Sequence, residues 1–248
     1  MTILEISYPK SGTHALWQVL QALVPPEPEP LPPPFFSVFE SVGTRRTPQD
    51  AVNWLRSLRP NDVAASHLYA WERVVEIASS PLFVTYFIHR DLRDVCVSYV
   101  THVTKIDASH YHHDAYMSLP NFDARLTVSI LDVMGSNSNI GLRFKPYLKW
   151  LDCPSVLSMR FRDLVSDRME TRLETLRSII RHFERQAGYL PFVDTPEALA
   201  TYMRPELSGT FAGINRWRQY FTARHKALFK DVTGDLLVRL GYEKSNDW

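Results

Sequence analysis

Short apolar runs alternate along this chain with longer segments that carry apolar residues at helical spacing. The short runs predict strands over Thr2–Tyr8, Asp62–Ser66, Leu82–His89 and Ser155–Arg160. The longer segments predict helices over Gly12–Leu23, Pro48–Leu58, Ala70–Ser79, Leu92–Val103, Ala124–Met134, Gly141–Leu151, Met169–Ala187 and Ala223–Leu240. Because strands and helices alternate, we expect a three-layer α/β fold with a mostly parallel central sheet and helices on both faces.

Two segments interrupt this alternation. Pro25–Pro34 contains too many prolines for a helix and predicts an extended polyproline II loop. Asp107–Pro120 is rich in histidine, tyrosine and methionine. Each segment is either a surface connection or a wall of a substrate pocket, and the sequence does not choose between the two.

Composition narrows the class of protein. The 248 residues suit one domain over 1–248, and 45% hydrophobic with 22% charged residues is typical of a globular protein. The formal net charge of +1 provides no general attraction for nucleic acid, so any anion site has to be local. The first predicted strand starts almost at Met1, so we expect no signal peptide, and no apolar run reaches membrane-spanning length. Cys96 and Cys153 are too few for a disulfide framework, so we expect free thiols and a cytoplasmic protein.

The segment Tyr-Pro-Lys-Ser-Gly-Thr-His at positions 8–14 carries the first candidate chemistry. It lies between the first strand and the first helix, where free backbone N–H groups and the helix dipole attract an anion. Lys10 adds a full positive charge, and Ser11 and Thr13 add hydroxyl donors. The order of residues differs from that of a nucleoside-triphosphate loop, in which the lysine follows the second glycine. Here Lys10 precedes Gly12.

A second strand-to-helix turn, Arg-Asp-Leu-Arg-Asp at positions 90–94, follows the third predicted strand. Ser98 lies eight residues after Arg90, about two helical turns further on. The Arg90 guanidinium can hold a phosphate with two hydrogen bonds, and the Ser98 hydroxyl can donate to the same group. Asp91 and Asp94 suit the positive start of a helix and need no ligand there.

Together the two turns resemble the phosphate-binding signatures of sulfotransferases that use 3′-phosphoadenosine-5′-phosphosulfate (PAPS). Residues 8–14 resemble the 5′-phosphosulfate loop of that family, and residues 90–98 resemble its 3′-phosphate signature. Three later segments are also similar to family motifs, so the resemblance covers most of the chain: Ser158–Asp167, Trp217–Thr222 and Gly234–Glu243.

The resemblance implies that PAPS donates a sulfonate group, that 3′-phosphoadenosine-5′-phosphate (PAP) is the product, and that no metal is needed. It implies cofactor contacts from Lys10, Ser11, Gly12, Thr13, His14, Arg90, Ser98, Gly213 and Arg216. It also gives Lys10 and Ser98 catalytic roles, in which Ser98 restrains Lys10 until the cofactor and the acceptor are both bound.

Two departures from the family pattern affect the nucleotide site. The basic pair that usually precedes a glycine near the late tryptophan is missing from Thr210–Trp217, which keeps only Gly213. Three arginines are left to contact the 3′-phosphate: Arg204, Arg216 and Arg218. The tryptophan that often stacks on adenine is also missing after residue 13, and Trp17 faces elsewhere on the helix.

His67 follows the predicted strand Asp62–Ser66, at the edge where ligands of open α/β sheets bind. The resemblance implies that it is the general base, for which an ordinary pKa near neutrality is well suited. The family often has a lysine two residues earlier, where this chain has Ala65, and the alternative is a structural histidine.

A histidine-rich group consists of His110, His112 and His113. Its spacing can occur in zinc sites, but no cysteine or second pair of histidines is nearby, so we expect an exposed loop instead.

We therefore expect an enzyme that transfers a sulfonate group from PAPS to a hydroxyl or amine of a small-molecule acceptor, with His67 as base. The alternatives are an ATP- and magnesium-dependent kinase and a nucleotide-binding protein without catalysis. Candidate residues for an apolar acceptor pocket are Phe35, Phe36, Phe39, Trp71, Tyr111 and Tyr116. Three carboxylates leave a cationic acceptor open: Asp107, Asp114 and Asp123. We expect no nucleic-acid or membrane partner, and either a monomer or a homodimer.

Overall fold

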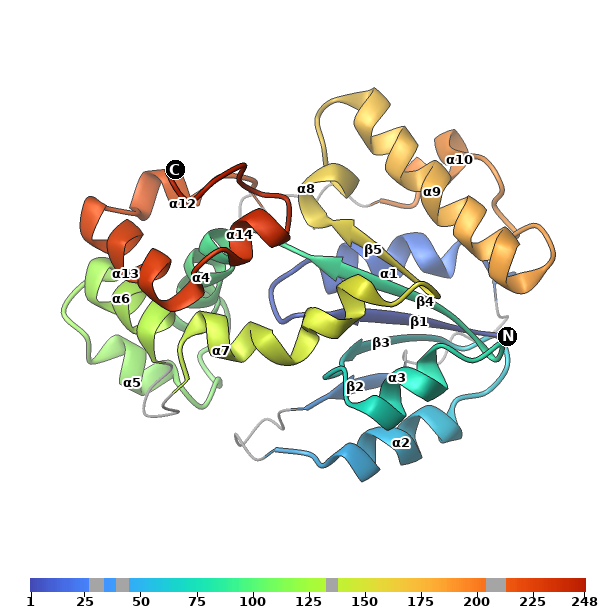
Figure 1. The fold of residues 1–248 in the computed structure, drawn as a ribbon, viewed down its shortest axis with the longest axis horizontal. Coiled ribbons are helices and arrows are strands. Elements are labelled where there is room, and N and C mark those ends of the chain that lie inside the picture. The colour runs from blue at the N-terminus through green and yellow to red at the C-terminus, as the bar shows by residue number, and fades with distance from the viewer. Residues whose placement is uncertain (27–33, 39–44, 133–137, 204–212) are drawn as a thin grey trace.

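The computed structural model describes residues 1–26, 34–38, 45–132, 138–203 and 213–248 (Figure 1). Within these residues, five parallel strands form one sheet in the order β2-β3-β1-β4-β5. The strands are β1 (Thr2–Ser7), β2 (Phe35–Ser37), β3 (Val63–His67), β4 (Phe83–His89) and β5 (Val156–Arg160). The predicted parallel α/β sheet is therefore confirmed.

The central strand β1 is buried along its whole length. Ile3 pairs with Val63 of β3 on one edge and with Val84 of β4 on the other. Successive side chains point to opposite faces of the sheet, so Ile3 and Leu4 join two different cores. An apolar run suits such a strand, because neighbouring strands cover its edges and helices cover its faces.

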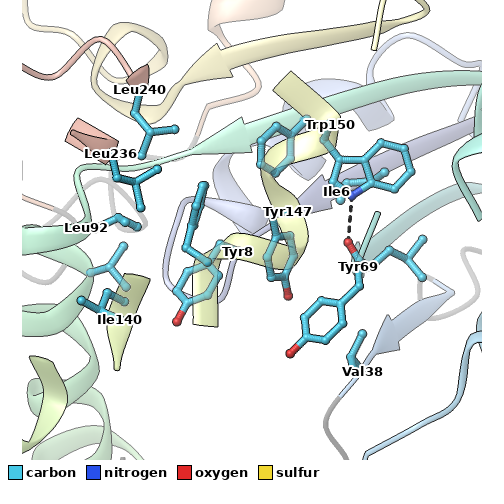
Figure 2. Close-up of a cluster of buried hydrophobic side chains, with 14 of the residues drawn as sticks. Ile6, Tyr8, Val38, Tyr69, Leu92, Ile140, Tyr147, Trp150, Leu236 and Leu240 are labelled. Carbon is cyan, nitrogen blue, oxygen red and sulfur yellow. Dashed lines mark hydrogen bonds between the residues drawn. The ribbon is translucent and has the colours of Figure 1, made fainter. Parts of the chain in front are cut away.

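Helices cover both faces of the sheet, as predicted. The core around Ile3 includes side chains of α1 (Thr13–Gln21), α8 (Phe161–Leu164), α9 (Met169–Ala187) and α10 (Pro196–Ala200). The core around Leu4, part of which Figure 2 shows, includes side chains of α2 (Pro48–Ser57), α3 (Glu72–Ala78), α4 (Leu92–Thr101), α6 (Phe122–Leu131), α7 (Ile140–Phe144), α12 (Trp217–Tyr220), α13 (Ala223–Thr233) and α14 (Leu236–Arg239). A smaller cluster joins α4 to α5 (His113–Met117).

Two predicted helices are divided where the backbone chemistry interrupts them. The helix predicted over Gly141–Leu151 consists of α7 and a 3₁₀ segment over Lys145–Asp152, because Pro146 has no N–H to continue the α-helical ladder. The helix predicted over Ala223–Leu240 divides into α13 and α14 at Gly234, which has φ 55° and ends the first helix.

Other predicted helix ends move by smaller amounts. The helix predicted over Ala124–Met134 begins earlier as α6, because the Asn121 side chain accepts an N–H of its first turn, and its last two residues lie outside the described part of the chain. The helix predicted over Leu92–Val103 continues beyond α4 into a π-helical turn over His102–Ile106. The helix predicted over Ala70–Ser79 is shorter at both ends, as α3.

The edge strand β2 is absent from the predicted strands, because its three residues directly follow the proline-rich run. Most of the loop predicted over Pro25–Pro34 lies outside the described residues. Among the described residues, no helix is long and apolar enough to span a membrane. Cys96 and Cys153 are free thiols, as predicted.

Candidate functional site

The candidate residues gather at the carboxyl ends of three neighbouring strands, β3, β1 and β4. β1 ends at Ser7 and leads into the loop before α1, β3 ends at His67, and β4 ends just before Arg90. Ligands of open parallel sheets bind at this edge. The sheet order therefore brings together residues of the two predicted phosphate motifs, although Lys10 and Arg90 lie 80 positions apart.

The loop between β1 and α1 is a tight turn with an unusual backbone. The N–H of Ser11 donates to the carbonyl of Tyr8 over 3.0 Å. Lys10 has φ 68° and Gly12 has φ 109°, both on the positive side that side chains disfavour. A Cβ atom at Gly12 would lie 2.3 Å from the Phe161 ring. Glycine is required at this position because of its backbone angle and because of the aromatic ring beside it.

Several groups of this loop have no partner within the described residues. No side chain caps the free N–H groups at the start of α1. The Ser11 hydroxyl is fully buried, and no hydrogen-bond partner in the described part of the chain reaches it. The Thr13 hydroxyl is already engaged, 2.6 Å from Ser7 Oγ. Because buried polar groups are nearly always paired, an anionic ligand with several oxygens fits this loop.

Lys10 gives the loop its charge. Burial and, to a smaller extent, the neighbouring Arg90 guanidinium lower the pKa of its ammonium group to about 8, against the effect of Asp107, which raises it. The lysine is therefore mostly charged at neutral pH. The two cations repel each other, so an anion bound beside both would be favoured.

Arg90 connects the loop to a distant part of the chain. Its Nη1 atom donates to the carbonyl of Lys10 over 3.2 Å, and its Nη2 atom donates to the carbonyl of Gly213 over 2.9 Å. The guanidinium carbon lies 5.0 Å from the centre of the Phe161 ring. Its buried Nε atom has no partner among the described residues. Ser98 lies about two turns further along the chain, in α4, and is 7% exposed.

Asp94 holds the Gly213 segment against α4. Its carboxylate accepts the N–H of Asn215 over 2.8 Å and the N–H of Trp217 over 2.9 Å. Asp91 instead caps α4 by accepting the N–H of Arg93 over 3.0 Å. The second aspartate therefore holds the segment that follows Gly213, in addition to suiting the helix dipole.

Arg216 lies beside Gly213, where a Cβ atom would meet the Arg216 side chain at 2.7 Å. Its charge lowers the pKa of Arg90, and its buried Nη1 atom has no partner among the described residues. Arg218 instead lies over the Trp217 ring, 4.7 Å from its centre. Arg204 and most of the segment predicted to replace the basic pair lie outside the described residues. Of the three arginines predicted to replace the basic pair, Arg216 is thus the described one with a buried nitrogen that has no partner among the described residues.

Arg93 has a structural environment that the sequence did not indicate. It is 2% exposed and forms ion pairs of 2.6 Å with Asp91 and with Glu243. Its guanidinium carbon also lies between two indole rings, 3.8 Å from the centre of Trp217 and 4.3 Å from that of Trp248. Such contacts fix the start of α4, and with it the position of Arg90.

His67 is half-buried at the end of β3, and β1 fixes its ring. Its Nδ1 atom lies 3.0 Å from the carbonyl oxygen of Ser7. A carbonyl only accepts hydrogen bonds, so Nδ1 carries the proton and Nε2 has a free lone pair. Burial lowers the pKa of His67 to about 4, against the effect of hydrogen bonds to Ser7 and Ser66. The ring is therefore neutral at pH 7 with a lone pair on Nε2 that can accept a proton, although the lowered pKa makes it a weaker base than an ordinary histidine.

Three tyrosine rings, those of Tyr8, Tyr147 and Tyr69, form a row (Figure 2). The Tyr147 ring centre lies 5.3 Å from that of Tyr8 and 5.2 Å from that of Tyr69, and their hydroxyl groups point to the same side of the row. The Tyr147 hydroxyl donates to the carbonyl of His67 over 3.4 Å. The half-exposed Phe35 ring meets the His67 ring edge-on at 5.3 Å. All three tyrosines are buried in the core around Leu4, whereas Phe35 is exposed beside the candidate base.

The other predicted pocket residues differ in position. Phe36 and Tyr116 are buried in cores, whereas Tyr111 is 47% exposed and Phe39 lies outside the described residues. The Trp71 ring packs edge-on against the Tyr69 ring, with ring centres 5.2 Å apart.

The histidine-rich segment is half-buried and not the exposed loop that we expected, because it packs against α4 and the π-helical turn after it, and His113 begins α5. The Tyr99 hydroxyl lies 2.7 Å from His112 Nδ1, and His113 Nδ1 lies 2.7 Å from the carbonyl of Val103. His110 stacks on the neighbouring tyrosine with ring centres 4.6 Å apart. Within the described ranges, no three side chains of histidine, cysteine, aspartate or glutamate are grouped so that they could hold a metal ion.

Trp17 and His14 complete the predicted residues of the first motif. Trp17 Nε1 donates to the carbonyl of Val63 over 2.9 Å, so its ring packs against β3. His14 lies exposed in the first turn of α1, and its charged form would lower the pKa of His67.

Comparison with known proteins identifies the fold. No family model and no curated protein matches this chain. Among solved structures, it is similar to mouse sulfotransferase SULT7A1 complexed with PAP, with a TM-score of 0.62 and 16% sequence identity. The match covers 98% of this chain and 87% of the mouse chain. The fold is therefore the sulfotransferase fold, as the sequence resemblance implied.

Proposed function

We propose that this protein transfers a sulfonate group from PAPS to a hydroxyl or amine of a small-molecule acceptor. The observation that supports this most is a pair of anion sites joined by one side chain. Lys10 and the Ser11 hydroxyl form the first site, and Arg90 Nε and Arg216 Nη1 form the second; the hydroxyl and both nitrogens have no partner within the described part of the chain. A nucleotide that carries a phosphate at each end of its ribose suits two such sites.

In this proposal the loop holds the 5′ end of the nucleotide. Lys10, Ser11 and the N–H groups of Gly12, Thr13 and His14 contact the phosphosulfate, because the uncapped start of α1 provides donors and partial positive charge.

The second site holds the 3′-phosphate. Arg90, Ser98 and Arg216 donate to it, and Gly213 allows the Arg216 side chain to approach the backbone closely. Phe161, which contacts both Arg90 and Gly12, lines a hollow with Ile214 and extends this site towards the rest of the nucleotide.

Bound PAPS supplies the sulfonate group that is transferred. His67 Nε2 accepts the proton of the acceptor hydroxyl or amine as its oxygen or nitrogen bonds to sulfur. Lys10 and the N–H groups at the start of α1 stabilise the negative charge on the phosphate oxygen that leaves. The loss of one such donor typically costs about 10²- to 10³-fold in rate. Ser98 restrains Lys10 until both substrates are bound.

The acceptor binds against the exposed Phe35 ring beside His67, which favours a small molecule with an apolar or aromatic part. Residues 1–248 act as one domain in the cytoplasm, either as a monomer or as a homodimer. The two free thiols agree with a reducing compartment.

Thermal unfolding in the presence of PAP tests the cofactor site, with AMP and magnesium–ATP as controls. At about 100 times its dissociation constant, a ligand adds roughly 2.7 kcal/mol of stability, or roughly 5–11 °C in Tm for a chain of this size. We expect this shift with PAP and its loss in Arg90→Ala. A shift only with magnesium–ATP would support the kinase alternative, and no shift with any nucleotide would refute the proposal.

Transfer of labelled sulfonate from PAPS to a set of phenols, alcohols and amines tests catalysis. We expect transfer by the wild type and none by His67→Gln, whose PAP shift should remain. A protein that binds PAP and modifies no acceptor would support the non-catalytic alternative.

A further inference from the structure

Three acidic side chains lie among the arginines of the proposed 3′-phosphate site. Arg93 forms ion pairs with both Asp91 and Glu243, each over 2.6 Å. Asp94 lines the same hollow as Arg90. One arginine therefore serves two carboxylates, and a third carboxylate lies beside the arginine that is proposed to bind the phosphate.

These acids leave little positive charge for a ligand. Taken together, Arg90, Arg93 and Arg216 carry three formal positive charges, and the three acids carry three negative ones. A phosphate monoester brings about 1.5 to 2 further negative charges at pH 7. The basic pair expected before Gly213 is missing from the sequence. A further cation beside Arg90 would therefore favour the bound phosphate.

Arg162 lies at this hollow. Its side chain lines the hollow together with Arg90, Phe161 and Tyr242, and 35% of the side chain is exposed. Its Nη2 atom donates to the carbonyl of Gly241 over 2.9 Å, and its guanidinium carbon lies 4.9 Å from the centre of the Tyr242 ring. These two contacts hold a positive charge beside the hollow.

No acid takes up this charge at close range. Within the described part of the chain, the ion pair of Arg162 is a long one, 3.9 Å from its Nε atom to Asp163 Oδ1. The Asp163 carboxylate already forms a 2.6 Å ion pair with Arg160. Arg162 is therefore available to an anionic ligand, whereas Arg160 is engaged.

A buried atom of Arg90 also points to a ligand in this hollow. Arg90 is 5% exposed, and its Nε atom has no partner among the described residues. Because buried polar groups are nearly always paired, the atom is suited to an oxygen that a ligand brings. An anion bound between the two guanidinium groups would satisfy Arg90 and contact Arg162.

We propose that Arg162 is a cofactor-binding residue that contacts the 3′-phosphate of the nucleotide and supplies positive charge in place of the missing basic pair. This rests on the proposed function, since it takes PAP as the ligand of the hollow. The alternative is a structural role, because Arg160 and Arg162 both donate to the Gly241 carbonyl, over 3.0 and 2.9 Å, and could serve only to hold that turn.

Calorimetric titration with PAP and with AMP tests the proposal, because AMP lacks the 3′-phosphate. In Arg162→Ala the dissociation constant of PAP should rise about tenfold, as the loss of one charge-assisted hydrogen bond at a partly exposed site implies. The dissociation constant of AMP should stay the same. Arg162→Lys keeps the charge and should recover part of the loss. Arg162→Gln, whose amide can still donate to Gly241, should weaken PAP binding as Arg162→Ala does, and it replaces that variant if the alanine lowers Tm.

The matched control is Arg160→Gln combined with Asp163→Asn. It removes the other donor to Gly241 together with its acidic partner and leaves the net charge unchanged. Both dissociation constants should stay at the wild-type values. Equal weakening of PAP and AMP in the Arg162 variants, or weakening of PAP in the control, overturns the proposal, because it assigns Arg162 to the Gly241 turn.

The wild type separates this proposal from the proposed function. If the wild type binds PAP and the Arg162 variants bind it equally well, the role of Arg162 is refuted and the proposed function stands. If the wild type binds no PAP, the proposed function is refuted, and the role of Arg162 is refuted with it.

Discussion

The substitution Gly12→Ala tests the geometry of the anion loop. An alanine at this position has to adopt φ 109°, and its Cβ atom would lie 2.3 Å from Phe161 Cδ2 and 2.9 Å from Phe161 Cε2. Phe161 is 3% exposed, so its ring has little room to move away. The substitution therefore combines backbone strain with overpacking at one position.

The two effects can be given magnitudes. A residue held in a sparsely populated backbone region costs about 1–3 kcal/mol. Overpacking in a closed core adds about 1–3 kcal/mol, which gives a total of roughly 2–6 kcal/mol. For a chain of this size, one kcal/mol corresponds to roughly 2–4 °C, so we expect Tm to fall by roughly 4–24 °C.

Thermal unfolding of three variants separates the contributions. Gly188→Ala is the matched control, because Gly188 has φ 77° and no atom within 4 Å of the added Cβ. It should lose only the strain part, about 1–2 kcal/mol or roughly 2–8 °C. Phe161→Leu added to Gly12→Ala should recover part of the lost Tm by making room. A Gly12→Ala variant no less stable than Gly188→Ala would refute the close approach of Phe161.

Three further predictions concern charge. Because the pKa of Lys10 is about 8, the lysine loses its positive charge as the pH rises above 8. In calorimetric titrations, the dissociation constant of PAP should therefore increase by up to about tenfold per pH unit. Lys10→Arg should remove this pH dependence, because arginine stays charged. Asp94→Asn keeps one acceptor oxygen for the two N–H groups of Asn215 and Trp217, so one of these charge-assisted hydrogen bonds is lost. The affinity for PAP should therefore fall by about tenfold, and an affinity equal to that of the wild type would contradict this. Burial lowers the pKa of His89 to about 3, so the unfolded state takes up the proton at a higher pH than the folded state does. The free energy of unfolding should therefore fall as the pH drops from about 6.5 towards 3, by up to about 1.4 kcal/mol per pH unit. In urea unfolding, His89→Gln should lose less stability between pH 7 and pH 5 than the wild type.

The fold was predictable from the sequence to the extent that its signals are local. The apolar runs of β1, β3, β4 and β5 and the long amphipathic α9 are complete within their own segments. The edge strand β2 has three residues and no periodic pattern, so only its pairing with β3 reveals it. Pro146 and Gly234 were visible in the sequence, but whether each ends a helix or is absorbed in it depends on packing around it.

In the candidate site, too, local sequence signals could be recognised, whereas contacts between distant segments could not. Lys10, Arg90 and His67 could be selected because each directly follows a strand, and parallel strands place such positions at one edge. Phe161, which lies beside Gly12, could not be selected. Its relevance comes from a contact between distant segments, and in the sequence it looks like an ordinary apolar residue after a strand.

The central position of β1 has a consequence for synthesis. β1 leaves the ribosome before its partner strands, which start only at Val63 and Phe83, so both of its edges lack their strands until those segments have been made. The proposed nucleotide site is completed later still, when the Gly213 carbonyl reaches Arg90. Chains that stop before this point would contain the lysine loop without its second half. Retention on a PAP-bearing resin would therefore select full-length translation products over truncated ones.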